Sequence, residues 1–452
     1  MARTMRKRSS VLLLSVIALV CLSASGEVRA GGGRRPAKRP LCRWRAQTPE
    51  VFTTDQKVRI EVELKNLSPT TQEGLVQYTI KDYYGTTVTE KRKMRVKIEA
   101  GKSHRLTIVP KTKMKGLFGV HCRFAGAEEA EIRFNYALLD PVPDKNEVDP
   151  ESPFGFGVYP ARHHEQGEKL IKLAQLAGVR SSRHEFYWVW IETQKGKFQL
   201  GKNKSVEQQT SHGMDIMGML AYTTFWATAT PKGDGFSIQA PPKHMADFEN
   251  FVFHTVQRYK ERVKSWEMWN EPNSKQFWMP RSDPKQYAEL CKAGYTGAKR
   301  ADPNCTVVGF GVFRTDYRFI ESAFKQGAIK HMDVISVHPY RYPLAPEDTF
   351  LGLRPLDEEL LKLKKLIDKY SGGKKKPIWL TEIGWATHRG FRGVSLNKQA
   401  DYIVRMYVLA LSVPTVEKIF WYNFRNFGTS KTYNEHNFGL LFYDLRPKPS
   451  YV

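Results

Sequence analysis

The sequence predicts a (β/α)₈ (TIM) barrel that is preceded by a small immunoglobulin-like β-sandwich. Three observations predict this fold class. Apolar residues alternate with polar ones between residues 41 and 139, short apolar segments alternate with longer amphipathic ones between 154 and 452, and a Pro- and Asp-rich linker, 140–153, separates the two regions. Over 452 residues, 41% are hydrophobic and 26% are charged. This composition excludes a wholly disordered or collagen-like chain.

The first 30 residues are predicted to be a signal peptide. Basic residues precede a short apolar run, 11–21, and small residues follow it. A membrane-spanning helix needs about 20 apolar residues, so the run is too short for one. Residues 31–40 (GGGRRPAKRP) form a basic linker. We therefore expect a secreted or periplasmic protein that meets a membrane only through its signal peptide.

The region 41–139 is expected to be the sandwich, and we interpret it as a spacer or accessory domain. Val58, Ile60, Val62 and Leu64 alternate with charged residues, and three later runs repeat the pattern between turn signals. No cluster of chemically active residues lies in this region.

Four cysteines follow the signal peptide, namely Cys42, Cys122, Cys291 and Cys305. An even number outside the cytosol permits two disulfides, and Cys42–Cys122 and Cys291–Cys305 are the local pairings. Four buried free thiols are the alternative that the sequence leaves open.

The region 154–452 is expected to form the barrel. Eight strands are expected at 154–159, 179–186, 215–223, 264–271, 306–312, 333–338, 377–382 and 416–423. Amphipathic helices are expected between them at 165–177, 242–262, 284–300, 357–370 and 397–412. Eight strands with intervening crossovers favour a closed barrel over an open sheet.

Two expected strands end in a carboxylate, at the end of the barrel where active sites lie. Residues 269–272 read W-N-E-P and contain Glu271, and residues 381–385 read T-E-I-G-W and contain Glu382. Simple alternation predicts that Glu271 shares the inward face with Trp269, and Glu382 with Leu380 and Ile378. Glycosidic bond cleavage needs two carboxylates. A spacing of about 5–5.5 Å gives retention of configuration and about 6.5–9.5 Å gives inversion.

Other residues of the two strands have different predicted places. Glu267 lies on the same predicted face as Glu271 but deeper, so we assign it to the barrel core as an ion-pair partner. Trp266 and Trp379 have the opposite parity and are expected to pack against the helices. The Asn270 amide lies at the rim, where it would bind a sugar hydroxyl.

These motifs resemble glycoside hydrolase clan A, and most closely its family 39-like retaining glycosidases. The second expected strand adds Arg183, followed by Trp188, Ile191-Glu192 and Lys195-Gly196. The sixth adds His338-Pro339-Tyr340, similar to the clan's H-P-Y, and the eighth adds Trp421. The resemblance spans residues 154 to about 445, with the motifs in the expected order.

The resemblance implies a role for each matching residue. Glu271 would be the acid/base and Glu382 the nucleophile, Asn270 would bind the sugar, and Arg183 and His338 would position or tune Glu382. Tyr340, Trp226 and Trp421 are further substrate-binding candidates, the two tryptophans as stacking platforms for a sugar. No metal or organic cofactor is expected, because His163-His164-Glu165 lacks helical ligand spacing and a third ligand.

One departure from the family concerns the end of the sequence. After Trp421 the chain runs to Pro447-Lys448-Pro449, a stretch that usually leads into the last barrel helix, and the printed sequence ends at Val452. We therefore expect an outer ring that is open beside the first and last barrel strands, with apolar surface exposed there.

The predicted function is a secreted retaining glycoside hydrolase that acts on a poly- or oligosaccharide. The net charge of +25 suggests an acidic glycan or an anionic surface. A catalytically silent carbohydrate-binding protein on the same barrel is the alternative. A nucleic-acid binder is disfavoured, because no recognised nucleic-acid motif occurs and the signal peptide indicates export. The sugar, the linkage, endo or exo action, transglycosylation and the oligomeric state stay open.

Overall fold

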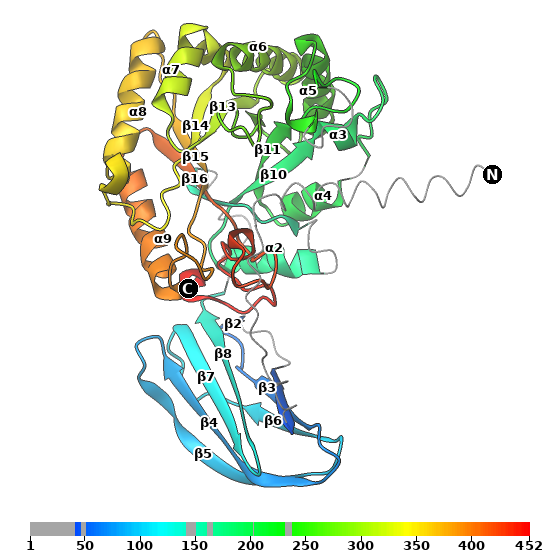
Figure 1. Cartoon of the computed structure of the whole chain (residues 1–452), viewed down its shortest axis with the longest axis vertical. Coiled ribbons are helices and arrows are strands. Elements are labelled where there is room, and N and C mark those ends of the chain that lie inside the picture. Colours follow the sequence, from blue (N-terminus) through cyan, green and yellow to red (C-terminus); the bar gives the residue numbers. More distant parts are fainter. Residues whose placement is uncertain (1–40, 47–50, 142–150, 161–165, 202, 231–236) are drawn as a thin grey trace, which may run out of the picture.

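The computed structural model describes residues 41–46, 51–141, 151–160, 166–201, 203–230 and 237–452 (Figure 1). The predicted signal peptide, the basic linker, most of the 140–153 linker and His163-His164-Glu165 lie outside these residues. A β-sandwich forms the lower part of the molecule in Figure 1 and a barrel with its helices forms the upper part. Within the described residues, no helix has the length and apolar character needed to span a bilayer.

The sandwich is built from two sheets whose inner faces form one apolar core. Its strands are β1 (Cys42–Ala46), β2 (Val51–Thr53), β3 (Ile60–Asn66), β4 (Gln72–Asp82), β5 (Thr87–Ile98), β6 (Ser103–Ile108), β7 (Gly116–Ala125) and β8 (Glu129–Leu139). The sheets have the orders β1-β3-β6 and β2-β8-β7-β4-β5, and only the β2–β8 pair is parallel. Alternate residues of β3 and β7 are buried, as the period-two pattern requires.

Eight parallel strands close into the barrel in sequence order, which confirms the predicted fold class. They are β9 (Phe154–Phe156), β10 (Ser181–Tyr187), β11 (Asp215–Ala221), β12 (Ser265–Met268), β13 (Thr306–Phe313), β14 (Val334–His338), β15 (Ile378–Ile383) and β16 (Val416–Trp421). The helices are α2 (Gly167–Leu176), α3 (Trp188–Ile191), α4 (Lys204–Ser211), α5 (Met245–Tyr259), α6 (Pro284–Ala301), α7 (Tyr317–Lys325), α8 (Leu356–Tyr370) and α9 (Leu396–Leu411). Short 3₁₀ turns are η3 (Ser237–Gln239), η4 (Ala328–His331), η5 (Phe350–Gly352), η6 (Asn434–His436) and η7 (Pro449–Tyr451).

The barrel interior corrects one predicted orientation. Trp379 packs with residues from four other barrel strands, including Met217 and Phe420, so it fills the lumen and does not face the helices. The pairing of β15 with β16 shifts register between Ile378 and Trp379 and again between Leu380 and Ile383. The second shift breaks the simple alternation, so the parity counted back from Glu382 placed Trp379 on the wrong face. Trp266, by contrast, packs against Phe186 in the outer layer, as predicted.

The four described cysteines are free and buried, so both predicted disulfides are wrong. Cys42 lies in β1 and Cys122 in β7, which belong to opposite sheets of the sandwich. Cys291 packs beside Tyr287 on the preceding turn of α6 and is hydrogen-bonded to it, while Cys305 precedes β13. Burial raises the pKa of the Cys122 and Cys291 thiols to about 12, so these thiols stay protonated.

The carboxyl-terminal segment partly closes the gap that we expected in the outer ring. The turn η7 packs on α9, where the Ser450 hydroxyl donates to Gln399 Oε1 at 2.8 Å. The hydroxyl of Tyr451 donates to the Leu173 carbonyl of α2 at 2.9 Å. This segment therefore joins the two helices that flank the gap. Apolar surface is nevertheless exposed on α9, as predicted, at Val404, Val408 and Leu411.

The sandwich and the barrel share an apolar contact. Val51, Leu117 and Ala137 of the sandwich belong to the same buried cluster as the barrel residues of the outer layer. Figure 1 shows the ends of β2 and β8 directed at this part of the barrel, near α2 and the carboxyl terminus. The sandwich therefore packs on the barrel through buried apolar side chains.

Candidate active site

The two predicted glutamates lie at one place in the barrel mouth. Glu271 follows β12 by three residues and Glu382 lies in β15. One oxygen of each carboxylate and one ring nitrogen of His338 all lie within 4.8 Å of one another. This separation is close to the shorter of the two carboxylate spacings of glycosidases, about 5–5.5 Å, and well below the longer.

Glu271 reaches the mouth by a route that alternation does not predict. Trp269 and Glu271 have positive φ angles of 75° and 46°, a left-handed conformation that costs non-glycine residues of order 1–3 kcal/mol each. Trp269 therefore turns outward onto Trp278, and its indole N–H donates to the Phe277 carbonyl at 2.8 Å. The expectation that Trp269 and Glu271 share a face is wrong.

Glu382 also departs from simple alternation. Ile378 and Leu380 belong to the outer layer, whereas the Thr381 hydroxyl reaches His338 inside the mouth. A second register irregularity, between Leu380 and Ile383, lets Glu382 point into the mouth as well. Glu382 therefore does not share a face with Leu380 and Ile378 as predicted.

Arg183 of β10 joins the groups at the floor of the site. Its guanidinium donates to Glu267 Oε2 at 2.7 Å, to Glu382 Oε1, and to Asn270 Oδ1 at 2.8 Å. Glu267 is fully buried and also accepts from the Ser336 hydroxyl at 2.9 Å. Glu267 thus has the paired core position that the sequence predicted.

The two carboxyl groups of the mouth differ in acidity. Burial raises the pKa of Glu382 to about 7, against the opposing effect of the Arg183 charge and of a hydrogen bond from Tyr340 at 3.0 Å. Burial raises the pKa of Glu271 well above its usual value, and the negative charge of Glu382 raises it further. Glu382 therefore ionises first while Glu271 keeps its proton, which is the division that an acid and a nucleophile need.

His338 contacts Glu271 more closely than Glu382. Its Nδ1 lies 3.0 Å from Glu271 Oε1 and 3.7 Å from Glu382 Oε2, and its Nε2 lies 3.1 Å from Thr381 Oγ1. Burial and the nearby Arg183 charge hold the pKa of His338 well below its usual value, so the ring is neutral. The two ring nitrogens thus contact Glu271 and Thr381, and one of the two nitrogens carries the proton of the neutral ring. His338 therefore contacts both glutamates, Glu271 the more closely, and its role of positioning or tuning Glu382 stays a prediction.

Asn270 and Tyr340 are fixed beside the two glutamates. The Asn270 amide accepts from Arg183 and donates to the Tyr222 hydroxyl at 3.2 Å. Tyr340 is buried, and its hydroxyl donates to Glu382 Oε2. Both side chains therefore lie where a sugar bound between the glutamates would pass.

The two predicted tryptophan platforms are not exposed beside the glutamates. Trp421 is fully buried against Trp385, and its indole N–H donates to the Phe438 carbonyl at 3.3 Å, so it cannot stack on a sugar. Because Phe420 faces the lumen, alternation turns Trp421 outward and Tyr422 toward the mouth.

Trp226 lies to one side of the mouth. Its indole N–H donates to the Glu192 carbonyl at 2.9 Å, and Lys195 lies 5.4 Å from its ring centre. Its ring meets that of Trp188 edge to face. Among the described contacts, none joins Trp226 to either glutamate.

Two residues of the mouth were missed by sequence reasoning. The Tyr422 hydroxyl donates to Glu435 Oε2 at 2.8 Å, and the negative charge of Glu435 contributes to the raised pKa of Glu271 and of Glu382. Glu435 lies in η6, inside a long irregular segment after β16. No periodic pattern marks such a position, so only the fold could bring it to the site.

Glu271, His338 and Glu382 are close enough together to be considered as metal ligands. The Arg183 guanidinium, however, is in direct contact with Glu382 and already neutralises it. Tyr340 donates to the second oxygen of the same carboxylate. A fixed cation beside one of three ligands disfavours a second cation, and the cluster has the composition of an acid–base pair.

Tyr340→Phe is expected to lower kcat/KM about 10–100-fold below neutral pH, because a hydrogen bond to an ionised group contributes about 1.5–3 kcal/mol. The lost donor stabilised the carboxylate form of Glu382, so its pKa rises and the acid limb of the pH profile moves to higher pH. The profile of kcat/KM against pH measures both effects. Tyr342→Phe is the matched control, since Tyr342 packs on Tyr340 and donates no hydrogen bond within the described residues. If the acid limb lay at the same pH in Tyr340→Phe and Tyr342→Phe, Tyr340 would have no part in lowering the pKa of Glu382.

Comparison with known proteins finds similarity to one family of glycoside hydrolases. The model of Glycosyl hydrolases family 39 matches residues 239–452. The chain is 25% identical over 236 residues to a β-xylosidase of Geobacillus stearothermophilus, and the match covers 47% of this chain and 45% of that protein, so it spans less than half of the relative's length.

Solved structures of family 39 enzymes are similar to this chain over a larger part of its length. A family 39 glycoside hydrolase from the gut symbiont Bacteroides cellulosilyticus WH2 has 25% identity and a TM-score of 0.69, covering 90% of this chain and 81% of that one. A family 39 β-xylosidase of Caulobacter crescentus shares the fold, with 22% identity and a TM-score of 0.53 over 67% of this chain and 70% of that one. With the two carboxylates at the ends of the fourth and seventh barrel strands, this chain is similar to the family 39 glycoside hydrolases of clan A in sequence, fold and motif order.

Proposed function

We propose that the chain is a secreted retaining glycoside hydrolase that cleaves O-glycosidic bonds of a poly- or oligosaccharide by double displacement. The observation that carries the proposal is the pair Glu271 and Glu382, within 4.8 Å of each other and unequal in acidity. A spacing this short leaves no room for a water between the sugar and the second carboxylate, so that carboxylate itself attacks.

The first displacement follows from the protonation states. Glu382, held by Arg183 and Tyr340, attacks the anomeric carbon as the carboxylate. Glu271 donates its proton to the departing oxygen, so the bond from the anomeric carbon to that oxygen breaks as the bond to Glu382 forms. In the second displacement the Glu271 carboxylate removes a proton from water, and the water oxygen replaces Glu382 on the sugar. Both carboxyl groups then regain their starting states.

Several finer parts of the proposal rest on sequence alone. Secretion, or export to the periplasm, rests on the predicted signal peptide, and an acidic glycan as substrate rests on the net charge of +25. The name of the relative from Geobacillus stearothermophilus makes an aryl β-xyloside the first probe to try.

Product stereochemistry tests the proposal. Proton NMR of the first product from a nitrophenyl glycoside is expected to show the anomeric configuration of the substrate. A glycoside fluorinated at the carbon next to the anomeric centre is expected to leave a sugar attached to Glu382, found by peptide mass spectrometry. Inverted product, or a label on another residue, contradicts the double displacement. Binding without turnover of any probe would favour the silent carbohydrate-binding protein instead.

A further inference from the structure

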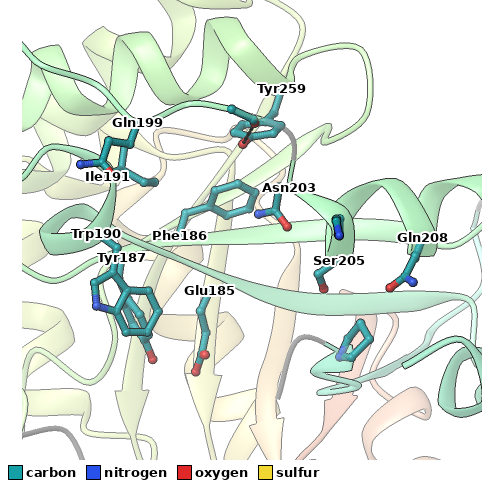
Figure 2. A pocket seen from close by; sticks show the side chains of 13 residues that line it. Glu185, Phe186, Tyr187, Trp190, Ile191, Gln199, Asn203, Ser205, Gln208 and Tyr259 are labelled. Carbon is teal, nitrogen blue, oxygen red and sulfur yellow. Dashed lines mark hydrogen bonds between the residues drawn. The ribbon is translucent and has the colours of Figure 1, made fainter. Parts of the chain in front are cut away.

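Two features outside the catalytic contacts lie near the barrel mouth. The first is a cavity of about 790 Å³ at the carboxyl end of β10, lined by residues of β10, α3 and α4 (Figure 2). Packed protein, the stacked rings of Tyr187 and Tyr222, lies between its wall and Asn270. The second is the side chain of Lys448, whose contacts lead into the active site.

Lys448 is fully buried, and in the part of the chain that the structure describes it forms no ion pair. Its amino group donates instead to three oxygens, each at 3.0 Å, namely Thr387 Oγ1, Asn426 Oδ1 and the Asn437 carbonyl. Burial lowers the pKa of Lys448 well below its usual value. Because a buried polar group without hydrogen bonds costs free energy, these three bonds are what stabilise a lysine here.

The three oxygens belong to two loops of the barrel mouth. Thr387 lies between β15 and α9, while Asn426 and Asn437 lie on either side of η6 in the segment that follows β16. The two loops also meet directly, since the Thr387 backbone N–H donates to the Asn437 carbonyl at 3.0 Å. One amino group therefore ties both loops to the segment that carries Lys448 itself.

Two of the residues that Lys448 binds are next to members of one small apolar cluster. The members of this buried cluster are Tyr340, Ala386 and Phe438. Ala386 directly precedes Thr387 in the chain, and Phe438 directly follows Asn437. Lys448 therefore fixes the backbone beside two of the three members.

The third member, Tyr340, contacts Glu382. The Phe438 ring packs edge to face on the Tyr340 ring with centres 6.2 Å apart, and the Tyr340 hydroxyl donates to Glu382 Oε2 at 3.0 Å. A hydrogen bond weakens steeply when its distance and angle are disturbed. A small displacement of the Tyr340 ring is therefore enough to weaken its bond to the carboxylate.

We infer that Lys448 is a positioning residue of the active site, which fixes the two loops around Tyr340 and so keeps the Tyr340 hydroxyl on Glu382. The inference rests on the proposed function, in which Glu382 is the nucleophile, and adds to it. The charged and titratable groups that surround the Glu382 carboxylate are Arg183, Glu267, Glu271, His338 and Glu435. Among the described contacts, none joins Lys448 to any of these groups, so its effect passes through Tyr340.

Lys448→Met removes the donors and keeps a long apolar side chain. In the folded protein it is expected to lower kcat/KM below neutral pH about 2–30-fold, the range for residues that act through others. The acid limb of kcat/KM moves to higher pH, as in Tyr340→Phe, because the Glu382 carboxylate is less stabilised. Tyr451→Phe is the matched control. It removes another buried hydrogen bond of the same segment, to the Leu173 carbonyl, and is expected to lower stability without moving the limb.

A double-mutant cycle tests the route. Lys448→Met combined with Tyr340→Phe is expected to have its acid limb at the pH of Tyr340→Phe alone, since no bond from Tyr340 is left to weaken. Shifts that add, a limb that stays in place in Lys448→Met, or an equal shift in Tyr451→Phe overturns the inference. A shift to lower pH also overturns it, because that is the result of moving the Glu435 charge away from Glu382.

Thr387→Val carries the test if Lys448→Met does not fold. Valine has the shape of threonine but lacks the hydroxyl that accepts from Lys448, so a smaller shift of the limb in the same direction is expected. A limb at the wild-type pH in that variant overturns the inference.

A measurement without turnover separates the inference from the proposed function. If the wild-type protein hydrolyses no glycoside, the proposed function fails. The titration of Glu382 is then followed by NMR of protein with carbon-13 in its glutamate carboxyl groups, and the Glu382 signal is identified by its loss in Glu382→Gln. A higher midpoint in Lys448→Met than in wild type and Tyr451→Phe supports the positioning role, and equal midpoints overturn it.

Discussion

Glu271→Gln is expected to lower kcat about 10²–10⁴-fold on substrates whose leaving group is a sugar, the range that general acid catalysis contributes. Glu271 holds its proton because burial and the Glu382 charge raise its pKa. A dinitrophenyl leaving group departs without a proton, so its release is expected to lose far less. Burst kinetics with the dinitrophenyl glycoside and steady-state kinetics with a disaccharide measure the two values.

Glu382 gives the complementary result in the same experiment. Glu382→Gln is expected to abolish turnover of both substrates, since no carboxylate is left to attack the anomeric carbon. Azide is expected to restore the Glu271→Ala variant with a glycosyl azide of retained configuration, and the Glu382→Ala variant with one of inverted configuration. Glu358→Gln is the control, as Glu358 lies in an exposed ion pair on α8. Equal losses on both substrates in the Glu271 variant would contradict its assignment as the acid.

The parts of the fold that follow from periodicity could be predicted from the sequence. The eight barrel strands lie within two or three residues of their expected ends, because buried parallel strands are continuous apolar segments that turn signals bound. The helices α3, α4 and α7 were not predicted. All three are short, and α4 also carries few apolar residues, whereas α7 is amphipathic and its pattern was overlooked.

The orientation of individual side chains at the mouth could not be predicted in this way. Alternation assumes a regular strand, but β12 ends at Met268 and left-handed residues carry the chain on to Glu271. The register shift of β15 between Leu380 and Ile383 has the same effect on Glu382, and it reverses the parity of Trp379 when that parity is counted back from Glu382. Glu271 and Glu382 were found all the same, because the motifs around them identify the residues whatever the local path of the backbone.

The contacts of Arg183 explain why one cation serves two different carboxylates. Glu267 is fully buried and needs a charged partner, and Glu382 needs a cation to ionise near neutral pH. A guanidinium presents several donors in a rigid plane, so it can meet both carboxylates and the Asn270 amide at once. A lysine at this position would have the charge without the geometry.

Arg183→Met is therefore expected to destabilise the protein by about 3–5 kcal/mol, the cost of leaving a buried carboxylate without its partner. It is also expected to raise the pKa of Glu382 above about 7, because the Arg183 charge lowers that pKa in the wild type. Glu382, the proposed nucleophile, is then less ionised at neutral pH, and the acid limb of kcat/KM moves to higher pH. Urea unfolding and the pH profile measure the two effects.

Two further variants separate the catalytic effect of Arg183 from its structural one. Arg341→Met removes another buried guanidinium, which pairs with Glu359, so it is expected to lower stability without moving the acid limb. Arg183→Lys keeps the positive charge, so its acid limb is expected to lie closer to the wild-type pH than that of Arg183→Met. It is still expected to lose activity, because an ammonium group cannot hold Glu267, Glu382 and Asn270 together. Two results would contradict this role: an unchanged acid limb in Arg183→Met, or an equal displacement of the limb in Arg341→Met. Either result would show that Arg183 supports the fold and has no part in setting the ionisation of Glu382.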